Sequence, residues 1–219
     1  MSYPTIAADT VPWLSVEQMA EADRLAVEVF GIDLLQMMEH AGRALADVVM
    51  TTAPDATIVV LAGGGSNGGG GLCAARHLLN RGRSVVVVTA SERQGAAAEH
   101  QLRTLAAMGT TPVTDPPDVP VVIDALVGYR LDGPLRGRAA ELAVWSSTRT
   151  VVSLDLASGL GHRGAVEPAS TMTLALPKMG LRGVRPLYVA DLGLPTALWM
   201  HMGIEVGSIF AKGPILEVV

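Results

Sequence analysis

The chain has 219 residues, of which 49% are hydrophobic and 17% charged, so it is long and apolar enough to bury a sizeable core. Its formal net charge of −5 argues against the basic surface that a nucleic-acid-binding protein usually presents. The single cysteine, Cys73, excludes an intramolecular disulfide and indicates a reducing compartment, so we expect a cytoplasmic protein with no nucleic-acid partner.

The N-terminal region is predicted to be helical and to carry no targeting segment. Its first residues, MSYPTIAADTVPWLS, lack the basic and apolar regions of a signal peptide. Ser15 and Gln18 fit a capping box before VEQMAEADRLAVEVF, and Asp33 is placed to cap LLQMMEHAGRALADVVM. No apolar run in the chain approaches the ~18 residues of a membrane span, so we expect no membrane partner.

From residue 57 onward, short apolar runs alternate with helical patterns. Continuously apolar strands separated by helices predict a parallel sheet that is covered on both faces. The sequence therefore predicts one doubly wound α/β domain preceded by a helical extension. The expected strands are TIVVLA, SVVVVTA, VPVVIDALVG, RTVVSLDLASG, TMTLAL and PLYVADLG, and the expected helices are GLCAARHLLNRG, GAAAEHQLRTLAAMG and PLRGRAAELAVWSS.

A glycine-rich stretch, GGGSNGGGG, lies between the first of these strands and a helix that we expect to begin by about Gly71. This context favours a turn that approaches a ligand over a flexible linker. The run matches the dinucleotide-binding pattern G-x-G-x-x-G, but this match is weak evidence because so glycine-rich a run matches almost inevitably. A Walker A loop is excluded because no Lys-Ser/Thr pair follows. Ser66 and Asn67 supply the only polar side chains, and free helix N–H groups there are expected to hold an anion or a polar ligand.

Two strands end in similar segments, VVIDALVG and VVSLDLASG, which contain Asp124 and Asp155. Because parallel strands end at one edge of a sheet, we expect Asn67, Asp124, Asp155 and Ser158 around a single crevice. The alternative is that each aspartate only caps or fixes its own loop. Oxygen ligands without Cys or His indicate a hard cation, if any, and the five histidines show no metal-ligand spacing. Lys178 is expected either to add charge to this crevice or to be solvated.

These motifs resemble the NAD(P)H-hydrate epimerase family, the YjeF N-terminal domain, across nearly the whole chain. Six segments of the chain carry the resemblance. Met37–Gly42 resembles the family motif L-M-E-N-A-G, Gly63–Gly71 resembles G-P-G-N-N-G-G-D-G, and Asp124–Arg130 resembles D-A-L-F-G-T-G. Farther along, Asp155–Gly159 resembles D-I-P-S-G, Thr171–Lys178 resembles T-V-T-F…P-K, and Asp191–Pro195 resembles D-I-G-I-P.

The resemblance implies a Rossmann-like, three-layer α/β/α fold with a mostly parallel sheet. We expect a single domain over 1–219, with N-terminal helices in 1–50, the core in 57–195 and an extension in 196–219. Many relatives carry a kinase-like dehydratase domain behind this one, for which we expect no room here. The family interconverts the R and S epimers of hydrated NADH and NADPH, which implies a nucleotide substrate rather than a cofactor.

The resemblance also implies the site residues. Asn67, Asp124 and Ser158 match the family's ligands of a potassium ion. If a cation engages Asp124, the expected catalytic residue is Asp155. Contacts to the hydrated nucleotide are implied at Ser66, Asn67, Gly68, Gly69, Gly70, Gly128, Tyr129, Arg130, Leu131, Asp132, Gly133, Pro134 and Asp155.

The chain departs from the family pattern inside these motifs. Gly70 replaces an aspartate, Ser66 an asparagine, Tyr129 a threonine and Arg130 a glycine. Metabolite repair by epimerisation is the function we predict. The alternative is a catalytically impaired module of the same fold that binds a nucleotide ligand or a protein. An NAD-dependent oxidoreductase is disfavoured because nothing resembles a hydride-transfer site.

The family is often dimeric, so a homodimer is expected. The apolar face of the second helix, with Met37, Met38 and Leu45, or the adjacent glycine-rich edge is the predicted contact surface.

Overall fold

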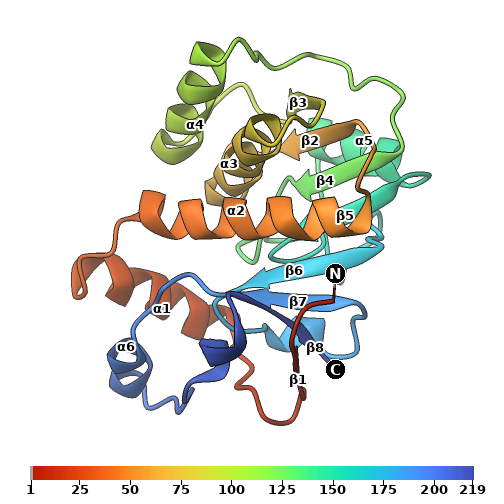
Figure 1. Cartoon of the computed structure of the whole chain (residues 1–219). Coiled ribbons are helices and arrows are strands. Elements are labelled where there is room, and N and C mark those ends of the chain that lie inside the picture. Colours follow the sequence, from red (N-terminus) through yellow and green to blue (C-terminus); the bar gives the residue numbers. More distant parts are fainter. Residues whose placement is uncertain (1) are drawn as a thin grey trace.

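The structure is a computed structural model that describes residues 2–219 (Figure 1). It contains one eight-stranded sheet in the order β1-β8-β7-β6-β5-β4-β2-β3, in which only the β7–β8 pair is antiparallel. The strands are β1 Thr5–Ile6, β2 Ile58–Ala62, β3 Val85–Thr89, β4 Val121–Ala125, β5 Thr150–Leu154, β6 Ser170–Leu174, β7 Leu187–Ala190 and β8 Ile215–Val218.

Helices cover both faces of this sheet. The α-helices of the described residues are α1 Val16–Glu28, α2 Leu34–Thr52, α3 Ser66–Asn80, α4 Ala96–Ala107, α5 Gly137–Ser146 and α6 Thr196–His201, with 3₁₀ turns η1 Met179–Leu181 and η2 Ile209–Lys212. Helices α2, α3 and α4 lie side by side on one face, and α5 lies on the other (Figure 1). No helix among residues 2–219 combines the length and the apolar character that crossing a bilayer requires.

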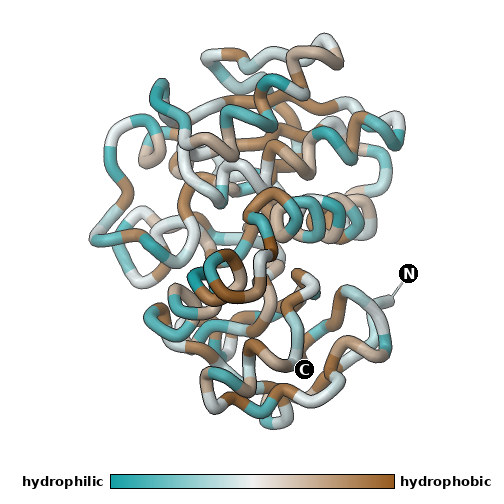
Figure 2. The backbone as a smooth tube through the Cα atoms, turned by 90° about the vertical axis from the view of Figure 1, so that its left-hand side faces the viewer, coloured by the Kyte–Doolittle hydropathy of each residue, from teal (hydrophilic) through white to brown (hydrophobic). Residues whose placement is uncertain are grey.

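The central strands show why the fold is layered. Every residue of β2 and β4 is buried, and successive residues point to opposite faces. Ile58 and Val60 pack under α2 and α3, whereas Val59 and Leu61 pack under α5. Figure 2 shows hydrophobic stretches of the chain in the interior and many hydrophilic turns at the outside. The three-layer α/β/α fold with a mostly parallel sheet is confirmed.

The strand order places a crevice at the carboxyl ends of β2 and β4. The chain passes from β2 outward to β3 and then crosses back over β2 to form β4. Ligands in open α/β sheets bind where the order reverses in this way, because the two neighbouring loops diverge there. Asp124 in β4 pairs in register with Leu61 in β2, directly below this point.

The N-terminal helices begin where their capping residues predict. The Ser15 side chain accepts a hydrogen bond from the backbone N–H of Gln18, and the side-chain oxygen of Gln18 accepts one from the backbone N–H of Ser15. The first of the two predicted dimer surfaces is wrong, because Met37, Met38 and Leu45 are buried within the same chain. A homodimer, with the adjacent glycine-rich edge as its contact surface, stays a prediction.

Two boundaries differ from those predicted. Helix α3 begins at Ser66, not near Gly71, so four consecutive glycines lie in its first turns. Residues 196–219, expected as an extension, also supply β8 to the sheet, and β8 in turn pairs with β1. Both short strands escaped prediction because they lack a long apolar run.

Close packing explains the glycines of α3 better than backbone freedom does. A Cβ on Gly68 would lie 1.8 Å from the carbonyl oxygen of Gly63, and one on Gly71 would lie 2.5 Å from the Cβ of Ala125. Glycine is a poor helix former, but here it lets α3 approach the ends of β2 and β4. Tertiary packing therefore overrides the intrinsic preference.

Changing Gly68→Ala is expected to lower the free energy of unfolding by about 3 kcal/mol or more. This is the upper end of the cost of overpacking, because the added Cβ clashes with backbone that cannot move aside. Chemical denaturation measures the change. Gly180→Ala is the control: a Cβ there meets only the end of the Leu160 side chain, at 3.7 Å, so its free energy of unfolding should stay within about 0.5 kcal/mol of the native value. Equal effects of the two variants would contradict this explanation.

Candidate functional site

A cavity of about 670 Å³ lies at the carboxyl edge of the sheet, beside the β2–β4 crossover. Its walls come from α1, α2, the start of α3 and the segments that follow β4 and β5. The side chains and backbone that line it are mixed in character, with apolar and polar groups from both the helices and the strand ends. They include Met19, Asp23, Met37, Met38, Ser66, Asn67, Gly70, Gly128, Tyr129, Arg130, Asp155 and Lys178.

Asp124 is fully buried at the end of β4, and donors surround its carboxylate. One oxygen accepts from Ser153 Oγ at 2.8 Å and from the Ser158 backbone N–H at 2.9 Å. The other accepts from Ser158 Oγ at 2.6 Å and from the Leu126 N–H at 3.2 Å. Burial raises the pKa of Asp124 above its ordinary value, and these hydrogen bonds oppose the rise. Asp124 therefore joins the loops after β4 and β5.

The hydroxyl of Ser158 cannot serve both of its acceptors at once. Its oxygen lies 2.6 Å from Asp124 Oδ1 and 3.0 Å from the carbonyl oxygen of Val127, and it also accepts from the Val127 N–H. One proton is shared between two acceptors, so a cation would satisfy the oxygen left without it. One carboxylate beside neutral oxygens is a donor set that fits a hard monovalent ion. Asp124 and Ser158, predicted as ligands, are brought into direct contact.

Asn67, the third predicted ligand, faces Asp155 across the backbone of Gly128. A Cβ on Gly128 would lie 3.0 Å from Asp155 Oδ2 and 3.3 Å from Asn67 Oδ1. The amide nitrogen of Asn67 is buried without a hydrogen-bond partner among the described residues. An unpaired buried donor at the wall of a cavity is costly unless a ligand engages it. Asn67 therefore lies where it can reach a polar group in the cavity.

Asp155 follows β5 directly and has a left-handed backbone, with φ of 69°. A non-glycine residue in this region costs roughly 1–2 kcal/mol, and such strain is concentrated at functional sites. Its carboxylate lies 2.6 Å from Lys178 Nζ and accepts from the Tyr129 N–H at 3.3 Å.

Lys178 is the buried partner of this carboxylate. Its side chain is 3% exposed, and Nζ also donates to the carbonyl oxygen of Leu174 and to Thr173 Oγ1. The expectation of a solvated lysine is therefore wrong, and the expectation of a charge in the crevice is correct. A base and an acid lie side by side at the cavity wall.

Tyr129 closes one side of the cavity. Its hydroxyl donates to Asp23 Oδ2 at 2.6 Å, and Arg130 Nε donates to the same hydroxyl at 3.0 Å. Burial raises the pKa of Asp23, and both burial and Asp23 raise the pKa of Tyr129. A second cavity of about 520 Å³ lies on the other side of Tyr129 and shares Gly128 and Lys178 with the first. The Tyr129–Asp23 contact thus separates two halves of a larger crevice.

Asp23 was not found by sequence reasoning. It lies within the amphipathic pattern of α1 and resembles any solvated helical aspartate, so no local signal marks it. Only the packing of α1 over the carboxyl edge brings it to Tyr129.

The remaining predicted contact residues fall into two groups. Ser66, Gly70, Gly128, Tyr129 and Arg130 line the first cavity, and Leu131 lines the second. Neither cavity is lined by Gly68 or Gly69, which are packed inside α3, or by residues 132–134, which lie farther along the loop. Their contact with a nucleotide stays a prediction.

The fold and this crevice define a doubly wound α/β protein with a polar ligand site at its topological switch point. Comparison with known proteins gives the family: the family described as YjeF-related protein N-terminus matches residues 34–180. The chain belongs to this family, and the resemblance of its motifs is confirmed.

Two relatives match over most of their length. An NAD(P)H-hydrate epimerase of Dehalogenimonas lykanthroporepellens is 38% identical, over 94% of this chain and 91% of that protein. Another NAD(P)H-hydrate epimerase, from Truepera radiovictrix, is 34% identical, over 88% of this chain and 94% of that protein. The crystal structure of the yeast protein YNL200c covers 95% of this chain and 100% of its own, with a TM-score of 0.82. At 24% identity, that likeness supports the fold alone.

Proposed function

We propose that the chain is an NAD(P)H-hydrate epimerase, an isomerase that interconverts the R and S forms of hydrated NADH and NADPH. The names of its relatives support this activity. The observation that carries it is the buried pair of Asp155 and Lys178 at the wall of the crevice.

The reaction inverts one carbon, which bears a hydroxyl beside a ring nitrogen. Inversion requires that a C–O or C–N bond break and form again from the opposite face. Either route moves a proton onto a leaving atom and takes one back when the bond reforms, and a positioned acid and base can accelerate such steps by about 10²–10⁴-fold.

Asp155 and Lys178 fit these two roles. The carboxylate is placed to accept a proton and the amine to donate one, and the two groups form a buried ion pair. Asn67 faces the same point and can orient a polar group of the ligand. Asp124 lines neither cavity and is engaged by four donors, so it is assigned a structural role rather than proton transfer.

Potassium is proposed as the ion of the Asp124 site. Asp124, Ser158 and Asn67 are the side chains that would hold it, and the Val127 carbonyl oxygen adds a neutral ligand beside them. When bound, the ion supplies a counter-charge to a buried carboxylate. A homodimer and use of the NADP form are proposed from the family resemblance, and a cytoplasmic location is proposed from the single cysteine.

The missing loop carboxylate gives a direct test of the activity. Gly70 lines the cavity, and a Cβ there would meet only the flexible end of Leu154, at 2.8 Å. Changing Gly70→Asp, which restores the family residue, should raise the rate by up to about 10²-fold if that carboxylate moves a proton. The measurement is conversion of purified R-epimer to S-epimer. Gly70→Asn, which places a side chain of the same shape without the carboxylate at the same point of the wall, should leave the rate unchanged.

A second candidate function is a catalytically impaired binding module. The observation in its favour is that Tyr129, Asp23 and Arg130 fill the middle of the crevice and bond to one another. No conversion by the native chain or by Gly70→Asp would favour this module over the enzyme. Conversion at an equal rate by both would instead make the missing carboxylate dispensable.

A further inference from the structure

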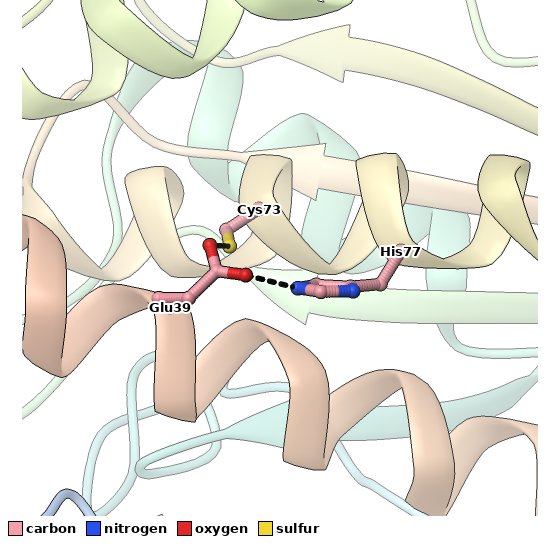
Figure 3. A group of neighbouring side chains, drawn as sticks. All are labelled: Glu39, Cys73 and His77. Atoms are coloured by element: carbon pink, nitrogen blue, oxygen red, sulfur yellow. Dashed lines mark hydrogen bonds and ion pairs between the residues drawn. The ribbon is translucent and has the colours of Figure 1, made fainter.

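A cluster of metal-ligating side chains lies outside the crevice, between α2 and α3. Glu39 comes from α2, and Cys73 and His77 come from α3, four residues apart and on the side that faces α2 (Figure 3). Gly42 makes room for the thiol, since a Cβ there would lie 2.5 Å from Cys73 Sγ. The spacing of the histidines alone does not reveal this group, because its three members are of three residue types and come from two helices.

The distances fit one small ion. Glu39 Oε2 lies 3.5 Å from Cys73 Sγ, Glu39 Oε1 lies 2.9 Å from His77 Nε2, and the three ligand atoms all lie within 4.8 Å of one another. A tetrahedral zinc ion with ordinary bond lengths holds sulfur, nitrogen and oxygen ligands about 3.4–3.6 Å apart.

Arg76 already places a positive charge at the centre of this cluster. Its Nη2 forms an ion pair with Glu39 Oε2 and lies 3.4 Å from Cys73 Sγ and 3.5 Å from His77 Nε2. Three groups with lone pairs thus converge on a single cationic position. The Arg76 side chain is 20% exposed, so it has a path to solvent when another cation takes that position.

We propose that Glu39, Cys73 and His77 form a binding site for a divalent ion of the zinc class, with Arg76 as the internal cation that occupies it in the metal-free protein. Thiolate, imidazole and carboxylate ligands select zinc or cobalt over potassium or magnesium. Binding releases the thiol proton, and the guanidinium moves to solvent. The ion would tie α2 to α3, two helices that wall the crevice.

Cobalt(II) titration of the tag-free chain tests this proposal. A thiolate-to-cobalt charge-transfer band and the visible bands of a four-coordinate ion should appear and saturate at one ion per chain, and zinc should abolish them. Arg76→Gln, which removes the competing cation, should bind at least tenfold more tightly. Cys73→Ser should lose the charge-transfer band and at least tenfold in affinity, and His77→Gln should lose a similar amount.

The matched control is His100→Ala, an exposed histidine on α4, which should bind as the native chain does. Thermal melting shows whether each variant is folded, and Glu39→Gln offers a second test if Cys73→Ser is not. The proposal is overturned if native chain and Arg76→Gln both fail to bind cobalt. Undiminished affinity in the folded Cys73 or Glu39 variant would also overturn it, because the ion would then lie elsewhere.

Discussion

Changing Asp155→Asn is expected to lower the rate of epimerisation by about 10²–10⁴-fold, because an amide cannot take a proton at neutral pH. Asparagine tolerates the left-handed backbone that this position requires, so the turn after β5 should keep its shape. The variant leaves Lys178 buried without its counter-charge, which costs about 3–5 kcal/mol of stability. Initial rates of conversion between purified epimers, measured well below the melting temperature, give the effect on catalysis.

The double variant Asp155→Asn with Lys178→Met separates catalysis from stability. Both charges are then absent, and a buried ion pair replaced by uncharged side chains often costs little stability. The melting temperature should therefore recover toward the native value while the rate stays low. If the double variant regained the native rate, Asp155 would be a structural residue and the proton-transfer role would be wrong.

The sequence was sufficient to predict the layered fold, because the buried strands and their helices carry strong local patterns. Its N-caps and the carboxyl-end positions of Asp124 and Asp155 follow from the same patterns. The start of α3 did not follow. A run of glycines reads as a loop, and only the contact between Gly68 and the backbone of Gly63 shows why a helix forms there.

The site was predictable in its residue types and not in its pairings. Motifs placed Asn67, Asp124, Asp155 and Ser158 at one edge, but they did not show that Ser158 bonds to Asp124. Lys178 follows the carboxyl end of β6, and its place in the crevice was one of two alternatives, but its pairing with Asp155 was not predicted. The role of Asp23 depends on how α1 packs over the crevice, which no local pattern records.

Changing Asp124→Asn is expected to abolish stabilisation by potassium and to destabilise the metal-free chain. Each carboxylate oxygen accepts from a backbone N–H, so either orientation of the amide sets an NH₂ group against a donor. An unsatisfied buried donor costs about 1–3 kcal/mol. That corresponds to a fall of about 2–4 °C in melting temperature for each kcal/mol in a chain of this size. Asp55→Asn, at a fully exposed aspartate, is the control and should respond to potassium as the native chain does.

The potassium effect on the native chain should also depend on pH. Burial raises the pKa of Asp124 in the folded state, so folding favours its protonated form. The resulting contribution to stability is fully present below the ordinary aspartate pKa of about 4. It is lost as pH rises through the raised pKa. Potassium binds the ionised form and offsets that loss. The rise in melting temperature when potassium replaces a large organic cation at equal ionic strength should therefore grow as pH increases from about 4 through the raised pKa. In Asp124→Asn this difference should be absent at every pH. A pH-independent potassium effect that survives in that variant would place the ion away from Asp124.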